Sequence, residues 1–200
     1  MGKNQSLTLP FPLILASTSK YRAKLLSQLG WTFETLAPGV DEDKMKALGL
    51  SPTELAKQLS IMKAHAVHIK KPLCCVIGSD QVLSLEDKIL GKPHTEERAI
   101  EQLHFMQGKT HELITAVTVK TPFISETFIN STKLHMRSLT LQQIKEYVEA
   151  DLPLDCAGSY KLESRGIKLF HHIEMSDYTS IIGLPLIELS NLLIKMGYPQ

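Results

Sequence analysis

The chain of 200 residues lacks a surplus of either charge. Its 22 Lys and Arg residues are balanced by 21 Asp and Glu residues, which gives a formal net charge of +1. Proteins that bind the nucleic-acid backbone take much of their affinity from an excess of basic side chains. The balance therefore argues against a nucleic-acid partner, and local basic groups are interpreted as sites for small anions.

Cysteine is also scarce. The chain has three cysteines, and two of them, Cys74 and Cys75, are adjacent within an apolar run. An odd number with this spacing is typical neither of a disulfide framework nor of a zinc site. We therefore expect reduced thiols and a cytoplasmic protein.

Long apolar runs are missing as well. No run approaches the ~20 residues that a membrane-spanning helix needs, and the first residues lack the core of a signal peptide. We expect no membrane association. Residues 1–12 are expected to form a flexible leader, although Gly2 and Ser6 resemble a myristoylation start. Residues 13–200 are expected to form one domain, because 43% of the chain is hydrophobic, which is enough for a sizeable core.

Strand and helix patterns alternate along the domain, which predicts an α/β fold. Strands are expected over 13–16, 32–36, 73–77, 82–85, 89–90, 111–121 and 123–137. Helices are expected over 20–29, 52–69, 95–108 and 140–150, and from Pro185 onward. The two long strands in the middle are expected to pair antiparallel and to form a second lobe on the same sheet. Because Gly-x-Gly-x-x-Gly and Walker motifs are absent, NAD-type and P-loop sites are disfavoured.

A strand followed by hydroxyl and basic residues opens the domain, in the segment Leu13-Ile-Leu-Ala-Ser-Thr-Ser-Lys-Tyr-Arg22. Ser19 is expected to begin the following helix. Backbone N–H groups, hydroxyls and a cation converge at such a helix N-terminus and attract an anion. We interpret the segment as an anion-binding loop.

Asp80 follows the apolar run 73–77 and is expected at the carboxyl end of a buried strand. In an α/β sheet, such ends line the ligand crevice, where a carboxylate can hold a divalent cation or take a proton from water. A lone Asp at such a position more often starts a turn. Lys92 favours the functional interpretation, because a hairpin over 82–90 would return the chain beside Asp80.

The segment Asp41-Glu42-Asp43 is a second acidic candidate. It is either a solvated charge run or a source of metal ligands, since Mg²⁺ on phosphates takes one or two carboxylates and several waters. Lys63 lies in the helix expected over 52–69, but spacing alone does not separate it from Lys57 and Lys70.

The remaining histidine and cysteine patterns have no partner in the sequence. His65 and His68 are three residues apart on one expected helix, and His171 and His172 are adjacent. No third ligand is evident for either pair, so we interpret them as ordinary residues. Cys156 lacks a Cys/His/Asn pattern and is interpreted as a packing residue.

Seven segments, taken in order, form a recognisable set: Leu15-Ala-Ser-Thr-Ser-Lys-Tyr-Arg22, Val40-Asp-Glu42, Lys63-Ala64, Gly78-Ser-Asp80, Gly91-Lys-Pro93, Ala157-Gly-Ser-Tyr160 and the stretch from Asp177 to Gly183-Leu-Pro185. The set resembles the Maf family of nucleoside triphosphate pyrophosphatases over about residues 13–196. The resemblance implies an ITPase-like, elongated mixed β-sheet flanked by helices, with two lobes and a central cleft. It also implies a homodimeric cytoplasmic enzyme that uses Mg²⁺ or Mn²⁺ to split a nucleoside triphosphate into a monophosphate and pyrophosphate.

The same resemblance assigns roles to basic and hydroxyl residues. Ser17 and Arg22 match the phosphate-binding loop of the family. Lys63 and Lys92 match lysines that contact phosphates.

Acidic residues are assigned in the same way. Asp80 matches the general base or metal ligand, and Glu42 matches an acidic residue of the metal site. Asp177 falls on a family motif and is expected to bind substrate.

Four departures from the commonest family pattern point to a subfamily: Lys20, Tyr21, Gln81 and Glu163. The last three resemble the 7-methyl-GTP pyrophosphatase group, which makes Tyr21, Gln81 and Glu163 expected substrate-binding residues. Methylation at N7 leaves guanine cationic, and a cation on an aromatic face gains roughly 0.5–2 kcal/mol. Glu163 can accept hydrogen bonds from the N1–H and N2–H₂ edge of guanine, and its charge strengthens both.

The expected mechanism follows from these roles. Arg22, Lys63 and Lys92 hold the triphosphate together with the metal ion, and Asp80 orients a water that attacks phosphorus. Positioning and charge neutralisation suffice for phosphoryl transfer. Two alternatives remain open: hydrolysis of dTTP, UTP or another modified nucleotide, and a nucleotide-binding regulator of cell division without useful turnover.

Overall fold

The computed structural model describes residues 10–86 and 88–200. Residues 1–9 of the expected leader therefore lie outside the described residues, and so does Asp87 in the expected hairpin turn. The described part of that leader is attached to the domain, since the Pro12 carbonyl accepts a hydrogen bond from the Cys75 N–H at 2.9 Å. Among the described residues, no helix is both long and apolar enough to cross a bilayer.

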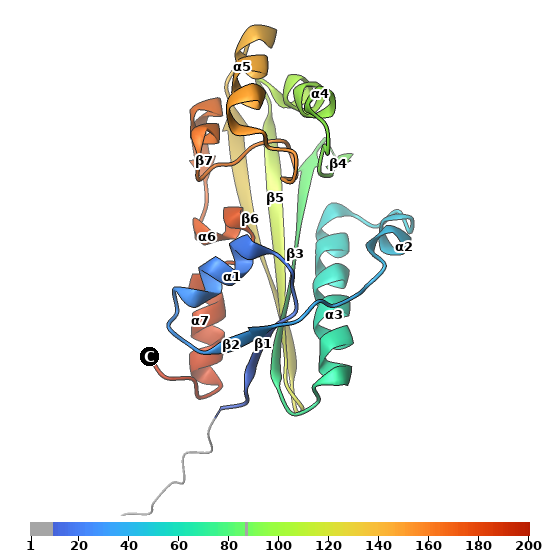
Figure 1. Cartoon of the computed structure of the whole chain (residues 1–200), viewed down its shortest axis with the longest axis vertical. Coiled ribbons are helices and arrows are strands. Elements are labelled where there is room, and N and C mark those ends of the chain that lie inside the picture. Colours follow the sequence, from blue (N-terminus) through green and yellow to red (C-terminus); the bar gives the residue numbers. More distant parts are fainter. Residues whose placement is uncertain (1–9, 87) are drawn as a thin grey trace, which may run out of the picture.

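One mixed sheet of seven strands runs along the length of the molecule (Figure 1). The strand order is β2-β1-β3-β5-β6-β7, and β4 pairs with β3. Strands β2, β1 and β3 are parallel neighbours, whereas β3, β5, β6 and β7 are antiparallel. The bounds are β1 Leu13–Leu15, β2 Phe33–Thr35, β3 Cys75–Leu85, β4 Lys88–Leu90, β5 Thr110–Lys120, β6 Ser125–Met136 and β7 Phe170–Glu174. The mixed sheet flanked by helices confirms the expected fold class.

Four of the helices begin where capping residues predict, whereas the short helices α2 and α6 were not expected. Ser19, Ser51, Thr95 and Thr140 each accept a hydrogen bond from a backbone N–H in the first turn, which satisfies a donor that the helix itself leaves free. The bounds are α1 Lys20–Ser27, α2 Glu42–Lys46, α3 Pro52–Lys70, α4 Glu96–Met106, α5 Leu141–Asp151, α6 Thr179–Ile182 and α7 Leu186–Lys195, with a 3₁₀-helix over Arg165–Leu169.

The polar segment in the middle of β3 was not expected to be strand. Separate strands over 73–77 and 82–85 were predicted, but β3 is continuous and pairs with β5 from Val76 to Ser84. The backbone can stay in the sheet because the polar side chains find partners; Ser79 Oγ, for example, donates to the Gly183 carbonyl at 2.9 Å. Asp80 therefore lies in the middle of a strand, and its expected place at a strand end is wrong.

Helices cover both faces of the sheet, and on one face they form two lobes. Leu13, Leu15 and Ile77 pack with α1 and α7, whereas Leu83, Leu113 and Met136 pack with α4 and α5 further along the same face. The opposite face packs against α3 through Ile14, Val76, Val82, Ile114 and Ala116. Figure 1 shows α4 and α5 near one end of the long strands, and α1 and α7 toward the other end.

The cleft between the lobes arises from how β3 is paired. On one side β3 contacts β5 along nearly its whole length. On the other side β1 pairs with Cys75–Ile77 and β4 pairs with Leu83–Leu85. Within the described chain, residues 78–82 therefore form an open strand edge between β1 and β4, and side chains from both faces of the sheet can reach it.

Gly78, at the start of this open edge, allows α3 to lie directly on the sheet. A Cβ at this position would lie 2.3 Å from the Ser60 carbonyl oxygen and 2.6 Å from the Ala64 nitrogen, both backbone atoms of α3. We expect Gly78→Ala to lower the free energy of unfolding by about 3 kcal/mol, the upper end of the usual overpacking cost. Urea denaturation measures this loss. Gly91→Ala is the matched control, because its Cβ would have no neighbour within 4 Å; equal stability of the two variants would contradict the close approach.

Candidate active site

The open edge of β3 lies in a cleft of about 1230 Å³. Its lining includes the following residues named from the sequence: Ser17, Tyr21, Arg22, Glu42, Lys63, Asp80, Gln81, Lys92 and Glu163. This volume exceeds the ~300–1,000 Å³ of typical small-molecule pockets. The structure thus brings together nine of the ten predicted site residues, and Asp177 lies elsewhere.

Lys63 joins the two acidic candidates at the bottom of the cleft. Its Nζ lies 2.6 Å from Asp80 Oδ1 and 2.7 Å from Glu42 Oε1. Lys63 and Asp80 are buried, whereas Glu42 is half-buried at the start of α2. The second turn of α2 supplies Lys46, at 4.0 Å from Glu42. Position 63 on α3, and not position 57 or 70, faces the carboxylates.

The two carboxylates have different acidities because their surroundings differ. Burial raises the pKa of Asp80 above its ordinary value, although Lys63 and Arg22 act in the opposite direction. Burial also acts to raise the pKa of Glu42, but the hydrogen bond and the charge of Lys63 outweigh it, and the pKa falls below its ordinary value. The Asp80 carboxylate is therefore a stronger base than an ordinary aspartate, which is the direction that general-base catalysis near neutral pH favours.

The predicted anion-binding loop forms between β1 and α1. The Ser17 hydroxyl accepts a hydrogen bond from the Ser19 N–H at 3.1 Å, and Ser19 in turn caps α1. Arg22 Nε donates to the Gly183 carbonyl at 2.9 Å, the same oxygen that Ser79 contacts. The Gly183-Leu-Pro185 segment thus holds the guanidinium at the cleft, where the charges of Asp80 and Glu42 act on it.

An aromatic and acidic group occupies another part of the cleft. Tyr21 is 39% exposed, and burial, followed by the charges of Asp155 and Glu163, raises the pKa of its hydroxyl. Of these two acids, Asp155 was not predicted as a site residue. In the sequence it is distinguished only by its position next to Cys156, and it is the fold that places it in the same cleft as Tyr21.

Gln81 and Asp177 use their side chains to shape the chain around the cleft. Gln81 Nε2 donates to the Ser180 and Ile181 carbonyls at 2.8 and 3.1 Å. The Asp177 carboxylate accepts from the Thr179 N–H and hydroxyl and from the Ile187 N–H. Both residues therefore fix α6, and Asp177, which lies outside the cleft lining, also holds the start of α7.

Taken together, the fold and the cleft define an α/β protein with a site for a phosphorylated small molecule. Cationic groups at a helix N-terminus lie beside two carboxylates, and an aromatic ring with acidic neighbours lies within the same cleft.

Comparisons with known proteins place this architecture in a family. The profile described as "Maf-like protein" matches residues 12–196, so the chain belongs to the Maf family. Three similar relatives are each named "7-methyl-GTP pyrophosphatase". The protein from Bdellovibrio bacteriovorus is 51% identical over 90% of this chain and 95% of its own length. The proteins from Xanthomonas axonopodis pv. citri and Pseudomonas aeruginosa are 45% and 44% identical, over 93% and 92% of this chain and 97% and 96% of their own lengths.

A solved structure shares the fold. The Staphylococcus aureus Ham1 protein superposes with a TM-score of 0.52 at 15% sequence identity, and the match covers 92% of this chain and 98% of that one. This similarity confirms the elongated α/β architecture that the resemblance implied.

The arrangement around Lys63 makes a prediction about the two carboxylates. Lys63→Met removes the positive charge between them, and an opposite charge at this distance lowers a carboxyl pKa by about 1–3 units. We therefore expect the pKa of Glu42 and that of Asp80 to rise in this variant, as measured by NMR titration of the labelled carboxyl carbons. Lys46→Met is the control, with a smaller rise at Glu42. A Glu42 pKa that is unchanged in Lys63→Met would contradict the ion pairs.

Proposed function

We propose that this chain is a nucleoside triphosphate pyrophosphatase that hydrolyses 7-methyl-GTP between the α- and β-phosphates, giving 7-methyl-GMP and pyrophosphate. The observation that carries the proposal is the Lys63 ammonium between Glu42 and Asp80, within one cleft with Arg22. Membership of the Maf family and the names of its relatives support it. As the resemblance implies, we also propose a homodimer that acts in the cytoplasm.

Glu42 and Asp80 fit a divalent cation. Their carboxylates converge on a single point, where Lys63 Nζ now contacts one oxygen of each. Mg²⁺ and Mn²⁺ prefer carboxylate oxygens and are held by one or two carboxylates together with substrate phosphates. We therefore propose these two residues as the holders of Mg²⁺ or Mn²⁺, which when bound would neutralise phosphate charge.

The basic residues bind and orient the triphosphate. Arg22, fixed through the Gly183 carbonyl, presents its guanidinium beside the N-terminus of α1. Ser17 adds a hydroxyl at the end of β1, and Lys92 adds an exposed ammonium from the loop after β4. Lys63 lines the same cleft, and its ammonium would shift from the two carboxylates to a phosphate oxygen when the substrate binds.

Asp80 is the proposed general base. Its carboxylate, buried at the open edge of β3, would accept a proton from the water that attacks the α-phosphorus. Pyrophosphate leaves with its charge neutralised by the surrounding cations, as phosphoryl transfer requires.

Tyr21, Glu163 and Asp155 are the proposed selectors of the base. The cationic ring of 7-methylguanine would stack on Tyr21, and two acids that line the same cleft and whose charges act on Tyr21 favour a positive charge there. Glu163 would accept the hydrogen bonds of the guanine edge. Gln81 would act indirectly, because its amide holds the residue 180–181 carbonyls.

A hydrolysis panel tests the function. Purified protein with Mg²⁺ is assayed for pyrophosphate release from GTP, 7-methyl-GTP, dTTP and UTP, and 7-methyl-GTP is expected to be cleaved with the highest kcat/KM. Asp80→Asn should lower kcat by roughly 10²–10⁴, as the loss of a general base does. Faster cleavage of dTTP than of 7-methyl-GTP would refute the assigned substrate. Binding without pyrophosphate release would support a nucleotide-binding regulator instead.

Tyr21→Arg tests the selection of the base. The substitution replaces a ring with a positive charge that repels the methylated base, so we expect kcat/KM for 7-methyl-GTP to fall at least about tenfold relative to that for GTP. Tyr21→Phe keeps the ring and should retain the preference. An increase in the preference for 7-methyl-GTP in Tyr21→Arg would show that the ring does not recognise the cation.

A further inference from the structure

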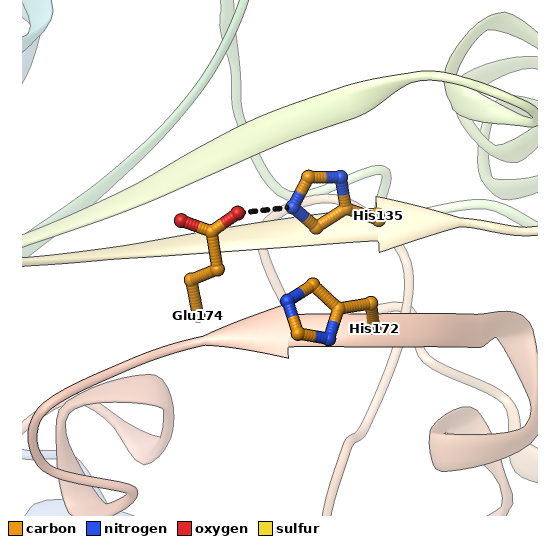
Figure 2. A group of neighbouring side chains, drawn as sticks. All are labelled: His135, His172 and Glu174. Carbon is orange, nitrogen blue, oxygen red and sulfur yellow. Dashed lines mark hydrogen bonds and ion pairs between the residues drawn. The ribbon is translucent and has the colours of Figure 1, made fainter.

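Three side chains that could bind a metal meet on the sheet outside the cleft. His135 extends from β6, and His172 and Glu174 extend from β7 (Figure 2). One ligand atom from each lies within 4.8 Å of the other two. His135 Nε2 lies 2.8 Å from Glu174 Oε1. No third ligand was evident from the sequence for His171 and His172, and the pairing of β6 with β7 now places His135 and Glu174 beside them.

The pairing of the two strands brings these side chains together. His135 lies opposite His172, and Met136 lies opposite Phe170, so His171 is the extra residue of a β-bulge. A bulge turns side chains away from the strict alternation of a strand. As a result both histidines of β7 approach His135, with ring centroids at 5.1 Å for His172 and 5.9 Å for His171.

The orientation of His135 suits metal binding. Its second ring nitrogen, Nδ1, lies 2.9 Å from the Thr110 hydroxyl on β5. In metal sites the other nitrogen of a histidine ligand is usually fixed by such a hydrogen bond, which sets the tautomer and the ring orientation. When a metal ion replaces the hydrogen bond between Nε2 and Glu174, the proton of the ring can reside on Nδ1 and be donated to the Thr110 hydroxyl. Nε2 is then unprotonated and can bind the ion.

We propose that His135, His172 and Glu174 bind one Zn²⁺-class transition-metal ion, with His171 or water completing the coordination. Two imidazoles and a carboxylate are a ligand set typical of zinc, whereas Mg²⁺ and Mn²⁺ prefer oxygen ligands. The ligand atoms need only small side-chain rotations to reach a common ion about 2.0–2.2 Å from each. Lys133, opposite Glu174 in the β6–β7 register, opposes the binding of a cation and limits the affinity.

This metal site is separate from the cleft. Leu134 and Met136 point into the core on one face, so His135 points to the other face, beyond the part that α3 covers. Its neighbour on β5 is Thr110, whereas Asp80 pairs with Ala116. Six residues of strand amount to roughly 20 Å, so the two groups are too far apart to share an ion.

Binding at this place would connect β7, the edge strand, to β6. An ion that binds only the folded chain stabilises it in proportion to its affinity and concentration. The chain after β7 leads through Asp177 to Gly183, which holds Arg22. The ion would therefore stabilise β7, the strand that precedes Asp177 and Gly183 in the chain, without contacting substrate.

Zinc titration of tag-free protein in excess Mg²⁺ tests the proposal. Isothermal titration calorimetry should give one Zn²⁺ per chain, and thermal denaturation should show a higher midpoint with zinc. His172→Ala should weaken binding at least roughly 10-fold, since loss of even an outer-shell partner costs roughly 10–100-fold. Co²⁺ in place of zinc should give d–d absorption bands that disappear in the same variant.

His104→Ala is the matched control, because His104 is an exposed histidine on α4 away from the cluster. The zinc affinity of the His104→Ala variant should equal that of the unaltered chain. Equal weakening in both variants, or full binding in His172→Ala, would overturn the proposal. Because zinc affinity, the thermal midpoint and the Co²⁺ spectrum are read without any hydrolysis, these outcomes are independent of the proposed pyrophosphatase activity.

Discussion

The contact of one ammonium with two carboxylates is the constraint around which the cleft is organised. Lys63 comes from α3, Asp80 from β3 and Glu42 from α2, so three elements must be placed together to form it. Removing one member of a buried ion pair costs about 3–5 kcal/mol, because the remaining charge has no partner. The close approach of α3 at Gly78 and the register of β3 with β5 both serve to keep these groups in contact.

A second set of contacts places the arginine. The Gly183 carbonyl receives hydrogen bonds from Arg22 and from Ser79, and the turn that carries it is held by Asp177 and Gln81. Residues that sequence motifs present as one group thus divide into two kinds. Some, such as Lys63 and Asp80, direct charged groups into the cleft. Others, such as Gln81 and Asp177, use their side chains to hold the backbone that supports the first.

The sequence was sufficient for most of the fold and for the membership of the cleft. Capping residues predicted the starts of α1, α3, α4 and α5, and apolar alternation predicted the long strands β5 and β6, whereas the short elements α2, α6 and β7 were not predicted. The continuity of β3 could not be predicted, because local pattern treats Gly78-Ser-Asp-Gln81 as a break while pairing with β5 keeps it extended. Spacing could not separate Lys63 from Lys57, nor relate Asp155 to Tyr21 or His135 to His172. Those relations depend on which segments the fold brings side by side.

The continuity of β3 also determines how the two halves of the molecule can move. The same eleven-residue strand belongs to both lobes, and its neighbours β5 and β6 span them as well. A hinge between the lobes would have to bend three hydrogen-bonded strands at the level of Asp80. Entry of a ligand must therefore rely on rearrangement of the surrounding loops and side chains, while the backbone of β3 that carries Asp80 stays in place.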